Sequence, residues 1–110
     1  MKTILIILFA LFSISCFSQE IYTVQYESQA DITVYVVDYE SQCDLKVYVV
    51  DYSSQSNGNE GNWYFVDYES QSDKTIYFVD YESQADLKIY FVDYESQAGW
   101  KNKSKQHLLY

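Results

Sequence analysis

The chain has 110 residues and a formal net charge of −9 at pH 7, because sixteen Asp and Glu outnumber seven basic residues. This acidic balance argues against nucleic-acid binding, which needs clustered Lys and Arg to neutralise phosphates. The length allows a single small domain with a modest hydrophobic core.

Residues 1–18 have the pattern of a signal peptide. A lysine at position 2 is followed by an unbroken apolar run, residues 4–12, and then by small and polar residues. The apolar run is shorter than the roughly 20 residues needed to cross a bilayer. We predict cleavage between Ser18 and Gln19 and a secreted or periplasmic mature chain. The alternative is a lipoprotein anchored through Cys16.

The mature chain is built from a short repeat. The hexapeptide VDYESQ or a close variant begins at Val24, Val37, Val50, Val66, Val79 and Val92. Successive copies are 13 residues apart, except for a spacing of 16 between the third and the fourth. A fixed short period indicates a repeat architecture. We therefore predict a six-repeat β domain over residues 19–100, with an insertion near residues 57–59 and a basic C-terminal tail over residues 101–110.

Each unit has the pattern of one β-strand followed by one polar turn. We number the positions of a unit from one to thirteen, so that the sixth unit, residues 86–98, begins with Asp86. Tyr at position five, Val at position seven and Tyr at position nine occur in all six units, and a spacing of two places them on one face of a strand. Aromatic and β-branched residues favour strands, and Ser, Gln and Asp are typical of turns. The repeat predicts an all-β fold.

The Tyr-Val-Tyr face is predicted to be the packed structural face of each strand, with the phenol hydroxyls at its rim. Its tyrosines are Tyr22, Tyr35, Tyr48, Tyr64, Tyr77 and Tyr90 at position five, and Tyr26, Tyr39, Tyr52, Tyr68, Tyr81 and Tyr94 at position nine. The opposite face is apolar at first and becomes acidic toward the end of the strand. The period alone does not distinguish between a meander, an antiparallel β-sandwich and a small β-solenoid.

One family resembles this sequence. The unit D-L/I-K-V/I-Y-x-V-D-Y-E-S-Q-A, the interrupting loop followed by Trp63 and Tyr64, and the final AGWK together look like the Septknot family of small bacterial repeat proteins. The resemblance covers the chain from Ile21 to about Lys105. It implies a compact domain of deeply knotted β-sheets, although true knots are otherwise almost absent from protein folds. It implies no catalytic residue, cofactor or ligand, and the function of the family is unknown.

No motif in the sequence indicates an enzyme or a cofactor. The single histidine, His107, lies in the tail, where the rigid partners of a Ser-His-Asp triad are not expected. Cys43 occupies a turn position that holds Ala or Ser in the other units, which indicates a small buried residue. Carboxylates on equivalent strands would lie about 5 Å apart if the strands were side by side, so position eight supplies weak calcium candidates. These are Asp38, Asp51, Asp67, Asp80 and Asp93.

These observations favour a secreted, non-enzymatic structural or binding module. One alternative is a self-assembling extracellular fibre, motivated by uncharged β-prone segments such as residues 89–92 and by the repeated glutamines. Another is a calcium-dependent adhesive module, motivated by the repeated carboxylates. The sequence leaves open a homo-oligomer, a partner at the cell surface and the identity of any ligand.

Overall fold

The computed structural model describes residues 19–56 and 58–109. The predicted signal peptide, with Cys16 and Ser18, therefore lies outside the described residues. Within the described ranges, no helix is both long enough and apolar enough to cross a membrane.

The chain alternates short strands with short 3₁₀ turns. The strands are β1 (Glu20–Thr23), β2 (Ile32–Val36), β3 (Leu45–Val49), β4 (Asn62–Phe65), β5 (Lys74–Phe78), β6 (Leu87–Phe91) and β7 (Gly99–Trp100). The turns are η1 (Glu27–Gln29), η2 (Glu40–Gln42), η3 (Ser53–Gln55), η4 (Glu69–Gln71), η5 (Glu82–Gln84), η6 (Glu95–Gln97) and the longer η7 (Lys103–Leu109). The predicted all-β class is confirmed.

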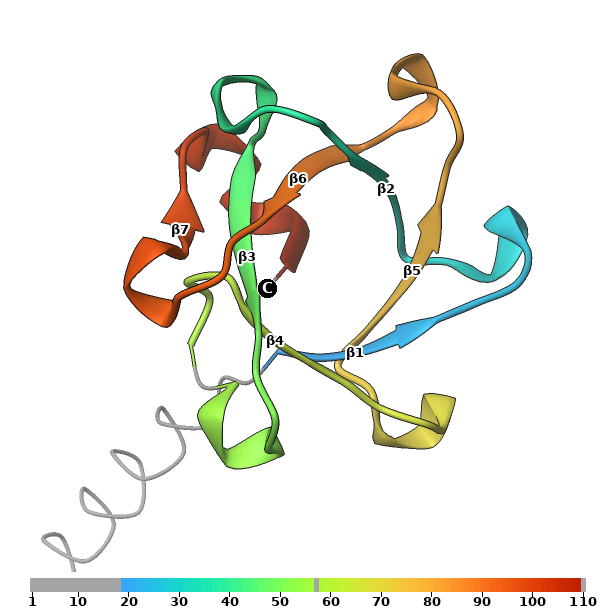
Figure 1. Ribbon diagram of the computed structural model, residues 1–110. Coiled ribbons are helices and arrows are strands. Elements are labelled where there is room, and N and C mark those ends of the chain that lie inside the picture. Colours follow the sequence, from blue (N-terminus) through green and yellow to red (C-terminus); the bar gives the residue numbers. More distant parts are fainter. Residues whose placement is uncertain (1–18, 57, 110) are drawn as a thin grey trace, which may run out of the picture.

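Strands β1–β6 form one closed parallel barrel (Figure 1). The order around it is β4-β1-β5-β2-β6-β3, and the pairing of β3 with β4 closes the circle. Strand β7 runs antiparallel to the beginning of β3. The antiparallel sandwich considered from the sequence is therefore wrong. The small solenoid is also wrong. A coil of 13 residues would pair each strand with the next one, whereas β1 pairs with β4 and β5, and the sheet closes into a barrel.

The chain passes around the barrel twice. Strands β1, β2 and β3 belong to the first circuit, and β5 and β6 later fill the two gaps between them, while β4 lies between β3 and β1. Adjacent parallel strands need a long connection between them, which a short turn alone cannot provide. Here the connection between most adjacent strands includes other strands and their turns, because consecutive strands do not lie side by side. The exception is the pair β3 and β4.

Neighbouring strands are staggered by two residues at every step around the barrel. Ile32 at position two lies beside Ile76 at position four, and the same offset recurs in the other pairings. Six steps of two residues give a total stagger of twelve, which tilts the strands strongly against the barrel axis. As a result, the turns project outward at separate places around the barrel instead of forming a row (Figure 1).

The barrel interior is filled from positions two and four. The side chains at position four are all 0% exposed: Ile21, Val34, Val47, Trp63, Ile76 and Ile89. Position two adds Ile32, Leu45 and Leu87 to the same cluster. The large ring of Trp63 packs edge-on against Phe65, with the ring centroids 6.2 Å apart. The core therefore lies on the face opposite to the predicted one.

The predicted packing of the Tyr-Val-Tyr face is wrong for its tyrosines. The rings at position nine are 65–68% exposed, and those at position five are only partly buried. Of this face, the valine at position seven is the most buried, with Val37 only 4% exposed. A closed sheet has only one inner face. The narrow interior of this barrel has room for a layer of residues of the size of Ile and Val, but not for a layer of six tyrosines.

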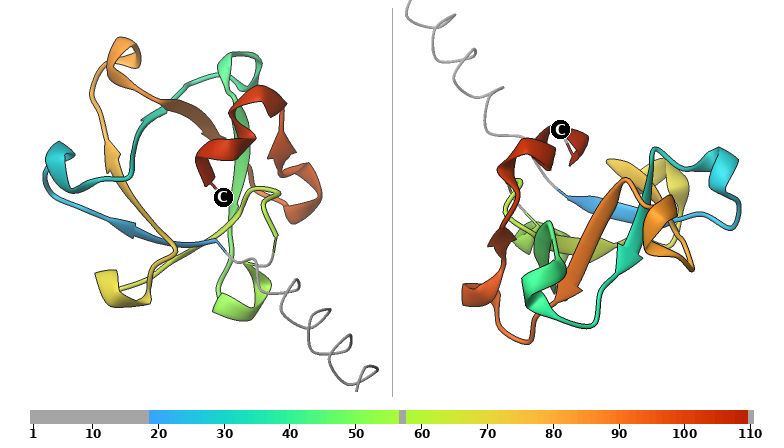
Figure 2. Two further views of the ribbon diagram at one scale, coloured as in Figure 1. Left: turned by 180° about the vertical axis from the view of Figure 1, so that it is seen from behind. Right: turned by 90° about the horizontal axis from the view of Figure 1, so that it is seen from above.

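The segment predicted as a tail belongs to the domain and closes one end of the barrel (Figure 2). Leu109 is 2% exposed within the core cluster, and its carbonyl accepts a hydrogen bond from Gln19 Nε2 at 3.1 Å. Lys105 Nζ lies 3.3 Å from the carboxylate of Asp44, which is itself buried. The described domain thus continues from Gln19 to Leu109, past the predicted boundary at residue 100.

The insertion holds this end closure in place. Asn59 is 6% exposed, its Nδ2 donates to the carbonyl of Gln106 at 3.0 Å, and its own carbonyl accepts from Trp100 Nε1 at 2.8 Å. Gly61, just after the insertion, has φ +92°, and a Cβ there would clash with the carbonyl oxygen of Lys46. Only glycine fits this approach between the insertion and β3.

Candidate functional site

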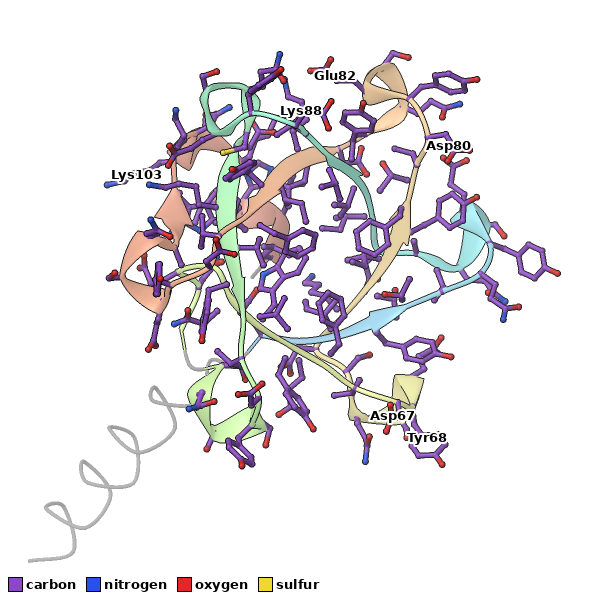
Figure 3. All side chains as sticks on the ribbon, viewed as in Figure 1. Asp67, Tyr68, Asp80, Glu82, Lys88 and Lys103 are labelled. Carbon is purple, nitrogen blue, oxygen red and sulfur yellow. The ribbon has the colours of Figure 1, made fainter. Side chains whose placement is uncertain are left out.

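Six surface corners repeat the same set of side chains, except for Gln25 in the first and Ser53 in the third. The five residues at positions eight to twelve of each unit are called a corner. In the fifth unit, the corner is residues 80–84. The tyrosine of each corner is 65–68% exposed. Figure 3 shows Asp67 and Tyr68 together at the edge of the molecule, in the corner that follows β4. The corners are the most regular exposed feature of the described chain.

Two backbone hydrogen bonds close the turn in each corner. The tyrosine is extended, and its carbonyl accepts from the N–H of the glutamine at position twelve, as for Tyr81 and Gln84 at 3.1 Å. The N–H at position thirteen donates a second hydrogen bond to the carbonyl at position ten, as from Ala85 to Glu82 at 3.1 Å. Neither bond uses the phenol, so this turn does not require tyrosine.

Acidic side chains flank most of the exposed rings. Asp precedes the tyrosine and Glu follows it, as at Asp80 and Glu82 (Figure 3). Glu82 lies 3.3 Å from Lys88, but its side chain is 57% exposed. Exposed pairs of this kind contribute about 0–1 kcal/mol to stability. The corners therefore combine an aromatic surface with negative charge.

The structure separates the weak calcium candidates. Asp38, Asp51, Asp67, Asp80 and Asp93 are all exposed, and each lies in a different corner. The expected row of neighbouring carboxylates does not form, because the two-residue stagger offsets equivalent positions and the corners point away from one another. Among residues 19–56 and 58–109, no three His, Cys, Asp or Glu side chains are grouped so that they could hold a metal ion.

A different set of aspartates, at position one, has a structural role that the sequence reasoning missed. Oδ2 of Asp86 accepts from the N–H of Thr33 at 3.0 Å, while the N–H of Asp86 donates to the carbonyl of Thr33 at 3.0 Å. The same reciprocal pair joins Asp31 to Thr75, Asp44 to Lys88 and Asp73 to Glu20. The signal was available, since Asp recurs immediately before the strand in most units.

Cys43 and His107 lie in separate surroundings. Cys43 is 6% exposed, and burial is the main cause that raises the pKa of its thiol, against an opposing effect of Lys101. A thiol with a raised pKa is mostly protonated at neutral pH and is a poor nucleophile. The ring of His107 is exposed, with Nδ1 2.9 Å from the carbonyl oxygen of Ser104.

A family model described as the 7(1) septoil knot domain matches residues 18–101. The chain belongs to the septoil knot family. The match spans all six units of this septoil knot protein and ends just after β7, before the helical turn that closes the barrel. No curated protein and no solved structure matches the chain.

Proposed function

We propose that this septoil knot protein is a secreted, non-enzymatic binding module that engages a repetitive extracellular surface through its six tyrosine corners. The observation that carries the proposal is the exposure of all six corner rings, between 65 and 68%. The turn is closed by backbone bonds, so the repeated tyrosine is explained better by contact with a ligand than by the fold. A partly exposed phenol offers both an apolar ring and a hydrogen-bonding hydroxyl.

Six equivalent corners suit multivalent binding. Linked sites raise the overall affinity by about 10²–10⁴ when several can engage at once. The corners lie at separate places around the barrel (Figure 1), so only some of them face any one flat surface. An extended or branched polymer reaches more of them than a flat lattice does.

The closed barrel supports a binding module better than a fibre. Fibre growth by strand addition needs an exposed strand edge. In the described chain, each of the strands β1–β6 is hydrogen-bonded to a neighbour on both sides.

The proposal is tested with the mature protein on surfaces that carry chitin, cellulose or peptidoglycan at several densities. We expect binding to at least one polymer that rises steeply with its density. Replacing all six corner tyrosines with serine should abolish it. A matched variant with the six position-eleven serines replaced by alanine should keep it. Absence of binding to all three polymers, or full binding by the serine-for-tyrosine variant, would contradict the proposal.

We also propose that the chain is knotted, as the name of the family implies. The support is the double circuit, in which β5 and β6 lie between strands that were laid down earlier in the sequence. Pulling the unfolded chain from its two ends in an optical trap should leave it shorter than its full contour length, because a tightened knot stores residues. A fully extended contour would refute the knot.

Export is proposed from the pattern of residues 1–18. Mass spectrometry of protein from the medium or periplasm should find a chain that begins at Gln19. A lipid-modified Cys16 at the new N-terminus would instead establish the lipoprotein alternative.

A further inference from the structure

The core is covered by the chain at one end of the barrel and is partly exposed at the other. At the end where the strands begin, the chain covers its own core, since Leu109 is 2% exposed and is bonded to Gln19 (Figure 2). At the end where the strands finish, the inner face continues into the side chains at position six. Val36, Val49 and Phe91 are 38–42% exposed there, which is unusual for apolar residues on an inner face.

We call these position-six residues the open mouth: Thr23, Val36, Val49, Phe65, Phe78 and Phe91. They form the layer above the core, since Val36 pairs with Ile89 and Val49 with Trp63 across neighbouring strands. The first circuit supplies Thr and Val, and the second supplies three Phe. Because the strands of the two circuits alternate, each Phe lies between smaller residues, Val or Thr, around the mouth.

Carboxylates lie beside this apolar ring. Phe91 lines a hollow of about 180 Å³ together with Asp93 and Gln97 of its own unit and Glu40 of another corner. Glu40 is 3.4 Å from Lys46, whereas in the described part of the chain no cation pairs with Asp93. A water molecule takes about 30 Å³ of the liquid, so the hollow has room for the head of a cationic side chain.

The closed end shows what kind of segment covers an end of this barrel. The segment that closes it carries lysines first and Leu108 and Leu109 afterwards. Its leucine enters the core, and Lys105 lies 3.3 Å from the carboxylate of Asp44. The open mouth offers the same two partners, an apolar layer and neighbouring carboxylates, and nothing in the described chain supplies the second such segment.

We propose that the open mouth docks a cationic peptide segment with an apolar tip, contributed by a partner protein. The tip packs on Phe91 and its neighbours, and a lysine or arginine of the segment enters the hollow between Glu40 and Asp93. A second copy of this chain is a poorer occupant. Two mouths facing each other would bring acidic corners together, and the basic segment of each copy already covers its own barrel.

The probe is the acetylated, amidated peptide Lys-Lys-Lys-Leu-Leu, added to the ¹⁵N-labelled mature protein and followed by NMR. We expect a dissociation constant at or below about 1 mM, with shift changes at Phe91, Val36 and Asp93. Peptides in which the leucines become serine or the lysines become glutamate should not bind. Added salt should weaken binding, because the charged contacts are exposed.

Two variants test the contacts separately. Phe91→Thr, which introduces the residue found at position six of β1, should weaken binding about tenfold. Asp93→Asn, on the surface, should weaken it about fivefold without affecting the fold. Asp80→Asn, in a corner that does not line the hollow, is the matched control and should change binding less than about twofold.

Three results would overturn the proposal: no peptide binding, unchanged binding by both variants, or shift changes confined to Gln19 and Leu109 at the closed end. A dimer seen by sedimentation without peptide, and abolished by Phe91→Thr, would assign the mouth to a second copy instead. This surface differs from the corner tyrosines, so the variant lacking the six corner rings should bind the peptide normally. Failure of one proposal therefore leaves the other open to its own test.

Discussion

The side chains at position four and the tyrosines at position nine are five residues apart in the same units, but their surroundings are opposite. Position four varies among Ile, Val and Trp and is 0% exposed throughout. Position nine never varies and is 65–68% exposed. A core needs apolar residues of suitable volume and tolerates exchange among them. Identity between repeats within one chain is therefore no measure of burial.

The largest effect is expected in the position-four layer. Ile76→Ala removes methyl groups from a fully buried site and should lower the free energy of unfolding by about 2–5 kcal/mol. Ile76→Val, the matched control, should cost about 0.5–1.5 kcal/mol. Urea unfolding followed by circular dichroism measures both. A loss as small for alanine as for valine would show that this layer is not packed as described.

Leu109→Ala should lower the free energy of unfolding by about 2 kcal/mol or more, because the leucine completes the core at the closed end. The amide protons near Gln19 should also exchange faster in this variant. His107→Ala, at an exposed position of the same turn, should leave both unchanged. Equal stability of the two variants would mean that the closing segment does not seal the barrel.

Asp44→Ala should cost about 1–3 kcal/mol, since it leaves the N–H of Lys88 without its carboxylate acceptor and removes the partner of Lys105. Asp51→Ala, in an exposed corner, should change stability by no more than about 0.5 kcal/mol. Thermal and urea unfolding of the two variants provide the comparison. The account fails here if the corner aspartate matters as much as the buried one.

The buried thiol of Cys43 should make the stability of the protein depend on pH. Burial raises the pKa of its thiol above the ordinary value of 9.0, so the unfolded chain releases this proton at a lower pH than the folded chain. Stability from the protonated thiol is full below pH 9 and is lost as the pH rises through the folded pKa. The stability of the wild type relative to Cys43→Ala should therefore fall as the pH rises above 9.0. A difference that stays constant over this range would refute the burial of the thiol.

The smallest effect is expected in the corners. Tyr81→Ser should change the free energy of unfolding by no more than about 0.5 kcal/mol, because the ring is 68% exposed and the turn is closed by backbone bonds. A loss above about 2 kcal/mol would place the ring in the packing after all. The same variant can then be used to dissect binding without loss of the fold.

Local features of the fold were predictable from the sequence, and its closure was not. The 13-residue period predicts a strand and a turn in each unit, and both are present. The assignment of the inner face failed because it followed the unvarying Tyr-Val-Tyr pattern. The better signal was polarity, since Tyr81 stands between Asp80 and a run of polar residues, whereas Ile76 is followed at position six by Phe78.

The order of strands could not be read from the period. Parallel neighbours such as β1 and β5 are separated by three other strands, and near-identical units give no preference for one pairing over another. The role of Leu109 was hidden for a similar reason, since two leucines at the end of a lysine-rich segment do not specify what they contact. The open mouth depends on both features and was equally beyond the sequence.

The most direct test of the account is a NOESY spectrum of residues 19–110 centred on Trp63, which is unique within its layer. The closed barrel predicts backbone contacts from β4 to two sides at once, joining Trp63 to Val49 of β3 and Phe65 to Ile21 of β1. The indole should show no contact with water on its ring carbons, since Trp63 is 0% exposed. Contacts from Trp63 to the corner tyrosines, or to β3 or β1 alone, would contradict a barrel whose core lies at position four.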